Sequence, residues 1–150
     1  MSLLNYLQSI NRQYLILPMA LVASLHANAA SWVEVGSNDA VVVSVDTDSL
    51  RRTGTKVKSW LQWQWSKQTE VPNSYPIKLY LLERQLQISD CKDKTLTIAQ
   101  GIRYADLNGN EVVDSYTITE KFQQYSEAVP ETIGESIIKF VCKATSSKKK

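Results

Sequence analysis

The chain has 150 residues, 17 of them basic and 15 acidic, and its formal net charge is +2 at pH 7. This length suits one domain built around one hydrophobic core. The near balance of charges excludes the strongly positive field by which many proteins bind nucleic acid, so we expect no nucleic-acid partner.

The first thirty residues have the organisation of a secretory signal. Arg12 is the only charged residue before an apolar run over 15–25, and the small residues Ala27 and Ala29 flank Asn28 just after it. Because a membrane span needs about 20 apolar residues, the pattern predicts a cleaved signal peptide over 1–29. A retained membrane anchor and a buried N-terminal helix are the alternatives. Cleavage would leave a periplasmic or secreted protein without a transmembrane span.

The single histidine and the two cysteines limit the chemistry of the mature chain. His26 would leave with the signal, and export places Cys91 and Cys142 in an oxidising compartment, which predicts a disulfide between them. Closing this loop should stabilise the fold by roughly 4 kcal/mol. The mature chain then lacks the residues of Ser-His-Asp and Cys-His catalysis and the usual ligands of zinc, copper and haem. We therefore expect no enzyme activity, no cofactor and no metal site.

Six short segments rich in β-branched and aromatic residues follow, separated by turn residues, which is typical of an antiparallel sheet. We expect strands at 31–35, 40–46, 55–66, 77–89, 95–105 and 111–118. In the third segment, Val57, Leu61, Trp63 and Trp65 occupy odd positions, while lysine and glutamine occupy most even ones. The odd side chains are therefore predicted to face the core.

Two aromatic residues lie outside this pattern and are candidate partner-binding residues. Trp60 shares the polar face of the third strand, where it would cover a neighbouring loop or form part of a binding surface. Tyr75 lies in the loop Pro72–Pro76.

Two acidic loops could each be interpreted as a functional site, but a turn explains both more simply. Asp106, Asn108 and Asn110 superficially resemble a calcium loop, but the sixth and twelfth positions lack its glycine and glutamate. The Asn108-Gly109 pair indicates a hairpin turn instead. Asp46 and Asp48 are close enough for acid and base roles, although turns favour aspartate for conformational reasons.

The last apolar segment predicts a helix. Thr132 and Glu135 have the spacing of a capping box, and the apolar residues that follow recur at helical spacing: Ile133, Ile137, Ile138 and Val141. Cys142 in its last turn would pin the helix to Cys91. We therefore predict an α+β fold, with a single antiparallel β-sheet of about six strands and one C-terminal α-helix packed on it and pinned by the disulfide.

Residues 144–150 are polar and basic, which predicts a disordered tail. Its cations Lys148, Lys149 and Lys150 would be solvated by default. They also offer a flexible cluster that could contact anionic lipid or polysaccharide, or host lysine-binding modules.

The order and spacing of several motifs resemble the bacterial surface-adhesin protein E family. The motifs run from Trp32-Val-Glu-Val through Val45-Asp46-Thr-Asp48-Ser-Leu50-Arg-Arg-x-Gly54 and Val57-Lys-Ser-Trp60 to Cys91, Tyr104, Gly109, Pro130-x-x-Ile-Gly-Glu135 and Cys142. They span the predicted domain, residues 30–143.

The resemblance implies an antiparallel sheet with a disulfide-held helix, and a non-enzymatic role. It further implies binding of host extracellular-matrix or serum proteins such as vitronectin, laminin and plasminogen. The family's named adhesin resembles a lipoprotein, whereas this chain has no cysteine before Cys91, so we expect a periplasmic or secreted protein rather than a surface-attached one. The alternative is a soluble periplasmic accessory protein that binds another envelope component or a small molecule. Pairing of sheet edges would allow a homodimer.

Overall fold

A computed structural model describes residues 30–146, so the predicted signal peptide over 1–29 and the cations Lys148 to Lys150 lie outside the described residues. The elements in chain order are β1 (Trp32–Ser37), β2 (Val41–Asp46), β3 (Arg51–Thr53), β4 (Lys56–Glu70), β5 (Leu79–Asp90), β6 (Thr95–Tyr104), β7 (Val112–Thr117), the 3-10 helix η2 (Glu120–Phe122), β8 (Ser126–Glu127) and α1 (Ile133–Ser146).

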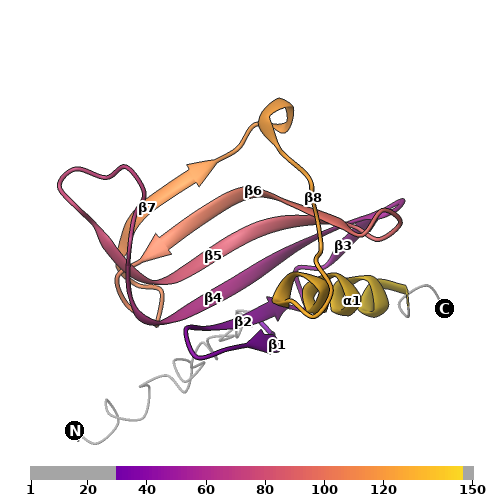
Figure 1. Ribbon diagram of the computed structural model, residues 1–150, viewed down its shortest axis with the longest axis horizontal. Helices are drawn as coiled ribbons and strands as arrows, with labels where there is room; N and C mark the ends of the chain where they lie inside the picture. Colours follow the sequence, from indigo (N-terminus) through magenta and orange to yellow (C-terminus); the bar gives the residue numbers. More distant parts are fainter. Residues whose placement is uncertain (1–29, 147–150) are drawn as a thin grey trace, which may run out of the picture.

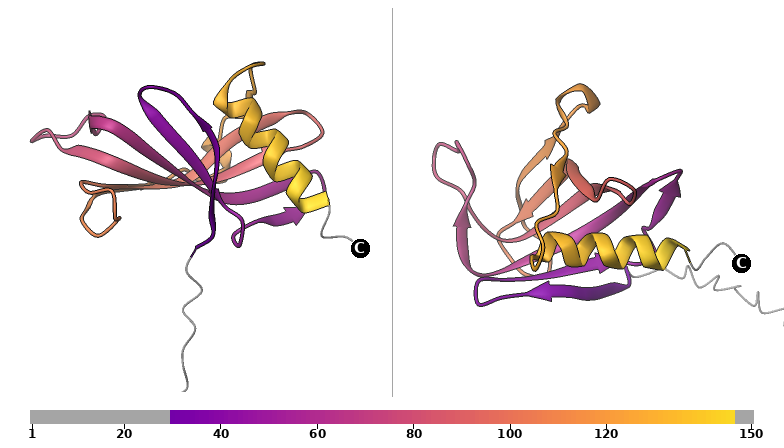
Figure 2. Two further views of the ribbon diagram at one scale, coloured as in Figure 1. Left: turned by 90° about the horizontal axis from the view of Figure 1, so that it is seen from below. Right: turned by 45° about the vertical axis from the view of Figure 1, so that its right-hand side comes forward.

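The strands form one twisted sheet, and every pairing in it is antiparallel. Its order is β1-β2-β4-β5-β6-β7, with β3 paired to β4 and β8 paired to β6. The helix α1 lies across one face, at the end of the sheet where β3 and the β5–β6 turn are found (Figures 1 and 2). This arrangement confirms the predicted antiparallel sheet with one C-terminal helix.

The sheet has eight strands, so the expectation of about six was wrong. The two additional strands are short and polar, so their sequences lack the alternation of apolar and polar residues that marks a half-buried strand. Arg51–Thr53 is exposed throughout and resembled a turn, yet it pairs with Lys56–Lys58. Ser126–Glu127 is only two residues long.

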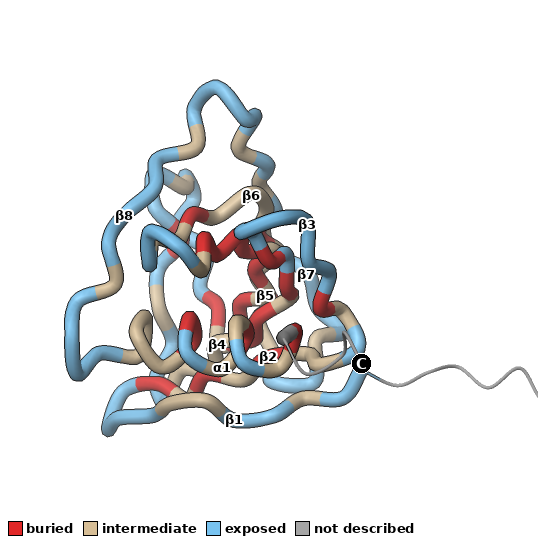
Figure 3. The backbone as a smooth tube through the Cα atoms, turned by 90° about the vertical axis from the view of Figure 1, so that its right-hand side faces the viewer, coloured by how far each residue is buried: buried red, intermediate tan, exposed pale blue. Residues whose placement is uncertain are grey.

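The core lies between α1 and the neighbouring part of the sheet (Figure 3). Val43 pairs with Trp63 across β2 and β4, and Val45 pairs with Leu61. Val43, Val45 and Leu61 belong to one buried cluster with Ile137 and Val141 of α1, and the partly buried Trp63 packs against it. The odd positions of β4 therefore face the core, as the alternation predicts, because successive side chains of a strand point to opposite faces.

The N-terminus of α1 is capped at the predicted residues, with one difference. Glu135 N donates to Thr132 Oγ1 at 3.4 Å, but the carboxylate of Glu135 accepts from Glu131 N at 3.0 Å rather than from Thr132 N. Glu131, the donor of this bond, has a φ of 63°, in the left-handed region. The helix continues to Ser146, so residues 144–146 of the expected disordered tail are helical.

The disulfide between Cys91 and Cys142 is present, as predicted, and joins residues 51 apart in the sequence. Arg52 of β3 reinforces this attachment, because its guanidinium donates to Cys142 O at 3.4 Å and to Thr145 Oγ1 at 3.1 Å. The C-terminal end of α1 is thereby fixed to β3 and to the turn that follows β5.

Candidate functional site

The face of the sheet turned away from α1 carries the even positions of β4. Lys56, Lys58 and Trp60 alternate there with buried Val57 and Ser59. Lys58 is directly opposite Ile88 of β5, and Trp60 is opposite Leu86. The structure thus gives this face a charged end at Lys56 and a more apolar middle.

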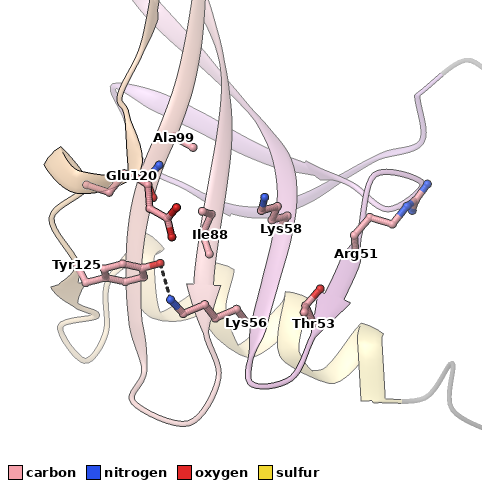
Figure 4. A pocket seen from close by; sticks show the side chains of 9 residues that line it. Arg51, Thr53, Lys56, Lys58, Ile88, Ala99, Glu120 and Tyr125 are labelled. Atoms are coloured by element: carbon pink, nitrogen blue, oxygen red, sulfur yellow. Dashed lines mark hydrogen bonds between the residues drawn. The ribbon is translucent and has the colours of Figure 1, made fainter.

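At the charged end, the face is hollowed into a pocket of about 320 Å³ that is open to solvent. We call it the cationic trough (Figure 4). It is lined by Arg51 and Thr53 of β3, Lys56 and Lys58 of β4, Ile88 of β5, Ala99 of β6, and Glu120, Gln123 and Tyr125 of the segment after β7. This size is at the small end of the range for ligand pockets.

Two cations of the trough oppose each other across neighbouring strands. Arg51 of β3 is the cross-strand partner of Lys58 of β4, and like charges in this position destabilise a sheet. The guanidinium of Arg51 donates to the backbone oxygens of Asp48 at 2.8 Å and Leu50 at 2.9 Å. These carbonyls hold the charge in place without neutralising it.

The third cation is held by an aromatic side chain from across the trough. Lys56 Nζ donates to Tyr125 Oη at 3.0 Å and lies 4.7 Å from the centre of its ring (Figure 4). This hydrogen bond, with the charges of Asp90 and Glu120 as smaller contributions, raises the pKa of Lys56 above its ordinary value. Lys56 is therefore fully charged at neutral pH.

The wall opposite β3 is a strap, residues 118–127, anchored at both ends on β6. Ile118 N donates to Ala99 O at 2.8 Å, and β8 pairs with Thr95 and Leu96. Between these anchors the strap projects from the sheet (Figure 1). It places Tyr125 and Glu120 above the strand residues that form the floor.

A second arrangement on the same face surrounds Arg84 of β5. Its guanidinium lies 5.7 Å from the ring centre of Trp32 and 5.3 Å from that of Tyr104, within the range of cation–π attraction. Its Nε donates to Gln62 Oε1 at 3.3 Å. These contacts join the edge strand β1 to β4, β5 and β6, so we assign Arg84 a structural role.

The face toward α1 carries a network of charged and tyrosine side chains on β5, β6 and β7. Arg103 NH1 donates to Asp114 Oδ2 at 2.8 Å, and Arg103 Nε lies 3.1 Å from Glu83 Oε1, as an ion pair without hydrogen-bond geometry. Tyr116 Oη donates to Glu83 Oε1 at 3.0 Å. The side chain of Glu83 is only 5% exposed, so the network is internal and is no open site.

The candidate residues predicted from the sequence are widely separated. Trp60 is half-buried on the face of the trough but does not line it. Tyr75 is 99% exposed and lies in the β4–β5 loop, at the opposite end of β4 from Lys56. Lys148, Lys149 and Lys150 lie outside the described residues.

The acidic loops have the hydrogen bonds of turns. Asp46 Oδ1 accepts from Asp48 N at 3.0 Å, and the carboxylate of Asp106 accepts from the backbone N–H groups of Asn108, Asn110 and Glu111. These bonds, led by that from Glu111, hold the pKa of Asp106 below its ordinary value. Gly109 has a positive φ of 75°, whereas Asn108 does not. Over residues 30–146, no group of three or more potential ligating side chains is placed to hold a metal ion.

The trough itself was missed by the sequence reasoning, because its residues come together only through the pairing of β3 with β4 and of β8 with β6. The lysines at 56 and 58 could be assigned to one face, but Arg51 was assigned to a turn. Glu120, Gln123 and Tyr125 lie more than sixty residues farther along the chain. A signal was present in the alternation of Arg51 and Thr53, which matches that of Lys56 and Lys58 across the hairpin.

The chain matches known proteins over most of its length. The family model for surface-adhesin protein E matches residues 32–143. A crystal structure of protein E from non-typeable Haemophilus influenzae has a TM-score of 0.57 and 15% identity, with 79% of this chain and 80% of that chain covered. A second structure of Haemophilus influenzae protein E has a TM-score of 0.56 and 15% identity, with 77% and 86% covered.

No curated protein sequence matches the chain. Among the described helices, none is both long and apolar enough to cross a membrane.

Proposed function

Because the chain belongs to the surface-adhesin protein E family, as the match over residues 32–143 establishes, we propose that it is an exported, adhesin-like module without enzyme activity. Its ligands are proteins, and host extracellular-matrix and serum proteins are the class that the family favours. Family membership, which confirms the resemblance of the sequence motifs, is the observation that supports this function most strongly.

An exposed apolar surface at one end of the sheet supports protein binding. Tyr75 is 99% exposed, Ile77 64% and Leu79 38%, and all three lie in or next to the β4–β5 loop. We call them the tip. Large apolar side chains grouped in solvent are typical of protein interaction sites, and tyrosine is enriched at the centre of such interfaces. Trp60, on the face turned away from α1, is a secondary candidate.

A second candidate function is that of a soluble periplasmic accessory protein, which binds another envelope component or a small molecule. The observation that favours it is the triplet Ala27-Asn28-Ala29, which fits cleavage of a signal peptide, together with the absence of a cysteine before Cys91. Such a chain would be released from its signal without a lipid anchor.

Protease treatment of intact cells separates the two functions. An adhesin-like protein should be recovered from the medium or digested on intact cells, whereas an accessory protein should be digested only after the outer membrane is permeabilised. A periplasmic marker enzyme that stays intact is the control. N-terminal sequencing of the recovered protein should begin at Ala30, and a chain that begins at Met1 would contradict export by signal cleavage.

A further inference from the structure

We propose that the cationic trough binds an acidic glycan, a polysaccharide that carries sulfate or carboxylate groups. This inference goes beyond the protein binding proposed above and does not depend on it. It rests on the charge, the hydrogen-bonding groups and the shape of the trough.

The first step is the charge. Arg51, Lys56 and Lys58 line the trough against a single carboxylate, that of Glu120, which leaves it two charges positive. Within the described part of the chain, the ion pairs involve other residues, namely Arg103 with Glu83 and Asp114, and Lys139 with Glu135. The cations of the trough are therefore unneutralised, and an anionic ligand would gain from all three.

The second step is the pairing of Arg51 with Lys58. These residues are directly opposite each other on β3 and β4, and the guanidinium of Arg51 is turned back to the carbonyls of Asp48 and Leu50. Like charges in opposite positions disfavour a sheet, and an oxyanion bound beside Lys58 would offset this as well as form charge-assisted hydrogen bonds. The site thus favours a ligand whose negative groups are compact and fixed on a rigid unit.

The third step concerns the neutral groups. Thr53 and Tyr125 contribute hydroxyls to the lining, and Gln123 contributes an amide whose nitrogen already donates to Ile118 O at 3.0 Å. Sugar hydroxyls both donate and accept, so they suit these groups, whereas an ionised acidic side chain only accepts. The floor formed by Ile88 and Ala99 is apolar, which suits the C–H face of a sugar ring.

The shape fits one part of a long ligand. A volume of about 320 Å³ accommodates a short segment, and the opening to solvent allows a polymer to continue past both walls. Tyr125 of the strap lies on one side of the trough, and Thr53 and Arg51 of β3 lie on the other, with the guanidinium of Arg51 turned outward (Figure 4). These features together favour a glycan over an acidic peptide.

Heparin, a sulfated polysaccharide, is a suitable probe for the mature chain, residues 30–150. We expect binding that weakens as salt is raised, because exposed charges are screened. The double substitution Lys56→Gln and Lys58→Gln should weaken binding about tenfold or more, as expected for lost hydrogen bonds to charged groups. Lys67→Gln is the matched control, since Lys67 is exposed on the same strand at its other end, and it should leave the affinity unchanged.

A substitution that strengthens heparin binding is an independent test, because a misfolded variant would not bind heparin more tightly. Glu120→Gln removes the only carboxylate of the trough and should strengthen heparin binding several-fold. Glu70→Gln, at the far end of β4, removes an exposed carboxylate outside the trough and should have no effect.

Four results would overturn the proposal. The first is heparin binding that is unaffected by the double lysine substitution. The second is binding that is lost on deletion of Lys148, Lys149 and Lys150 but not on substitution in the trough, which would assign it to the tail. The third is poly-glutamate that binds as tightly as heparin with the same dependence on Lys56 and Lys58, which would assign the trough to an acidic peptide. Uncharged dextran should not bind, and dextran binding equal to that of heparin would also contradict the role of charge.

Discussion

The ring of Tyr116 on β7 lies over Gly101, its cross-strand partner on β6. A Cβ atom at position 101 would collide with the Cζ, Cε1 and hydroxyl atoms of the tyrosine. The absence of a side chain at 101 therefore allows Tyr116 to cross β6 and donate its hydroxyl proton to Glu83 on β5 at 3.0 Å. Glycine is needed at position 101 because the ring of Tyr116 approaches the backbone closely, and not because the backbone conformation is unusual.

Gly101→Ala should destabilise the protein by about 1–3 kcal/mol, the usual cost of overpacking a filled interior. The change forces Tyr116 out of its position and weakens its bond to Glu83. Urea unfolding followed by tryptophan fluorescence measures the effect. In the background Tyr116→Ala, where the ring is absent, the same glycine substitution should cost much less. If Gly101→Ala lowered the free energy of unfolding equally in both backgrounds, the proposed collision with Tyr116 would be contradicted.

The stability of the protein should fall as the pH rises above about 10. Burial, followed by the charge of Glu83 and the hydrogen bond to it, raises the pKa of Tyr116 above its ordinary value of 10.0, and burial raises that of Tyr80 in the same direction. The folded state thus keeps a proton that the unfolded chain loses. This stabilisation is complete below pH 10 and is lost as the pH rises toward the folded-state pKa, by at most about 1.4 kcal/mol per pH unit for each tyrosine.

Urea midpoints measured between pH 8 and pH 11 test this dependence. Tyr116→Phe should reduce the slope above pH 10, because it removes one of the two phenols whose pKa is raised in the folded state. Tyr75→Phe, which removes a phenol that is 99% exposed, should leave the slope unchanged. If the urea midpoint of Tyr116→Phe fell with pH as steeply as that of the wild type, Tyr116 would not contribute to the pH dependence.

Arg103→Met should destabilise the protein by about 3 kcal/mol, because it leaves the buried carboxylate of Glu83 without its cation. The value is at the low end for buried ion pairs, since Asp114 is 28% exposed and can be solvated. Lys139→Met removes a solvent-exposed pair with Glu135 on α1 and should change the stability little. Equal unfolding midpoints for the two variants would contradict the importance of the internal network.

The residues that could be predicted from the sequence are those governed by local periodicity. Val57, Leu61 and Trp63 alternate with polar neighbours, and Ile137 and Val141 recur at helical spacing, so the core between β4 and α1 followed from the pattern. The pairing of Cys91 with Cys142 followed from there being two cysteines in a chain predicted to be exported.

The remaining features depend on contacts between distant segments. The buried polar residues Glu83 and Gln85 resemble a solvated strand face, and only tertiary neighbours explain their burial. Arg103 is opposite Glu83, and Tyr116 lies over Gly101, the cross-strand partner of Gln85. Likewise, Arg51 belongs to the trough only because β3 pairs with β4. Periodicity gives the direction of a side chain but not what covers it, and that information comes from tertiary packing.

The proposed adhesin-like function is tested most directly by the binding of the mature chain to immobilised matrix and serum proteins, with serum albumin as the reference surface. We predict saturable binding to at least one of vitronectin, laminin and plasminogen. Tyr75→Ala should weaken it several-fold, because an exposed aromatic side chain at the tip is removed. Phe122→Ala, an exposed aromatic on the strap, serves as the matched control and should not. Binding to all three proteins no greater than to albumin would contradict the function.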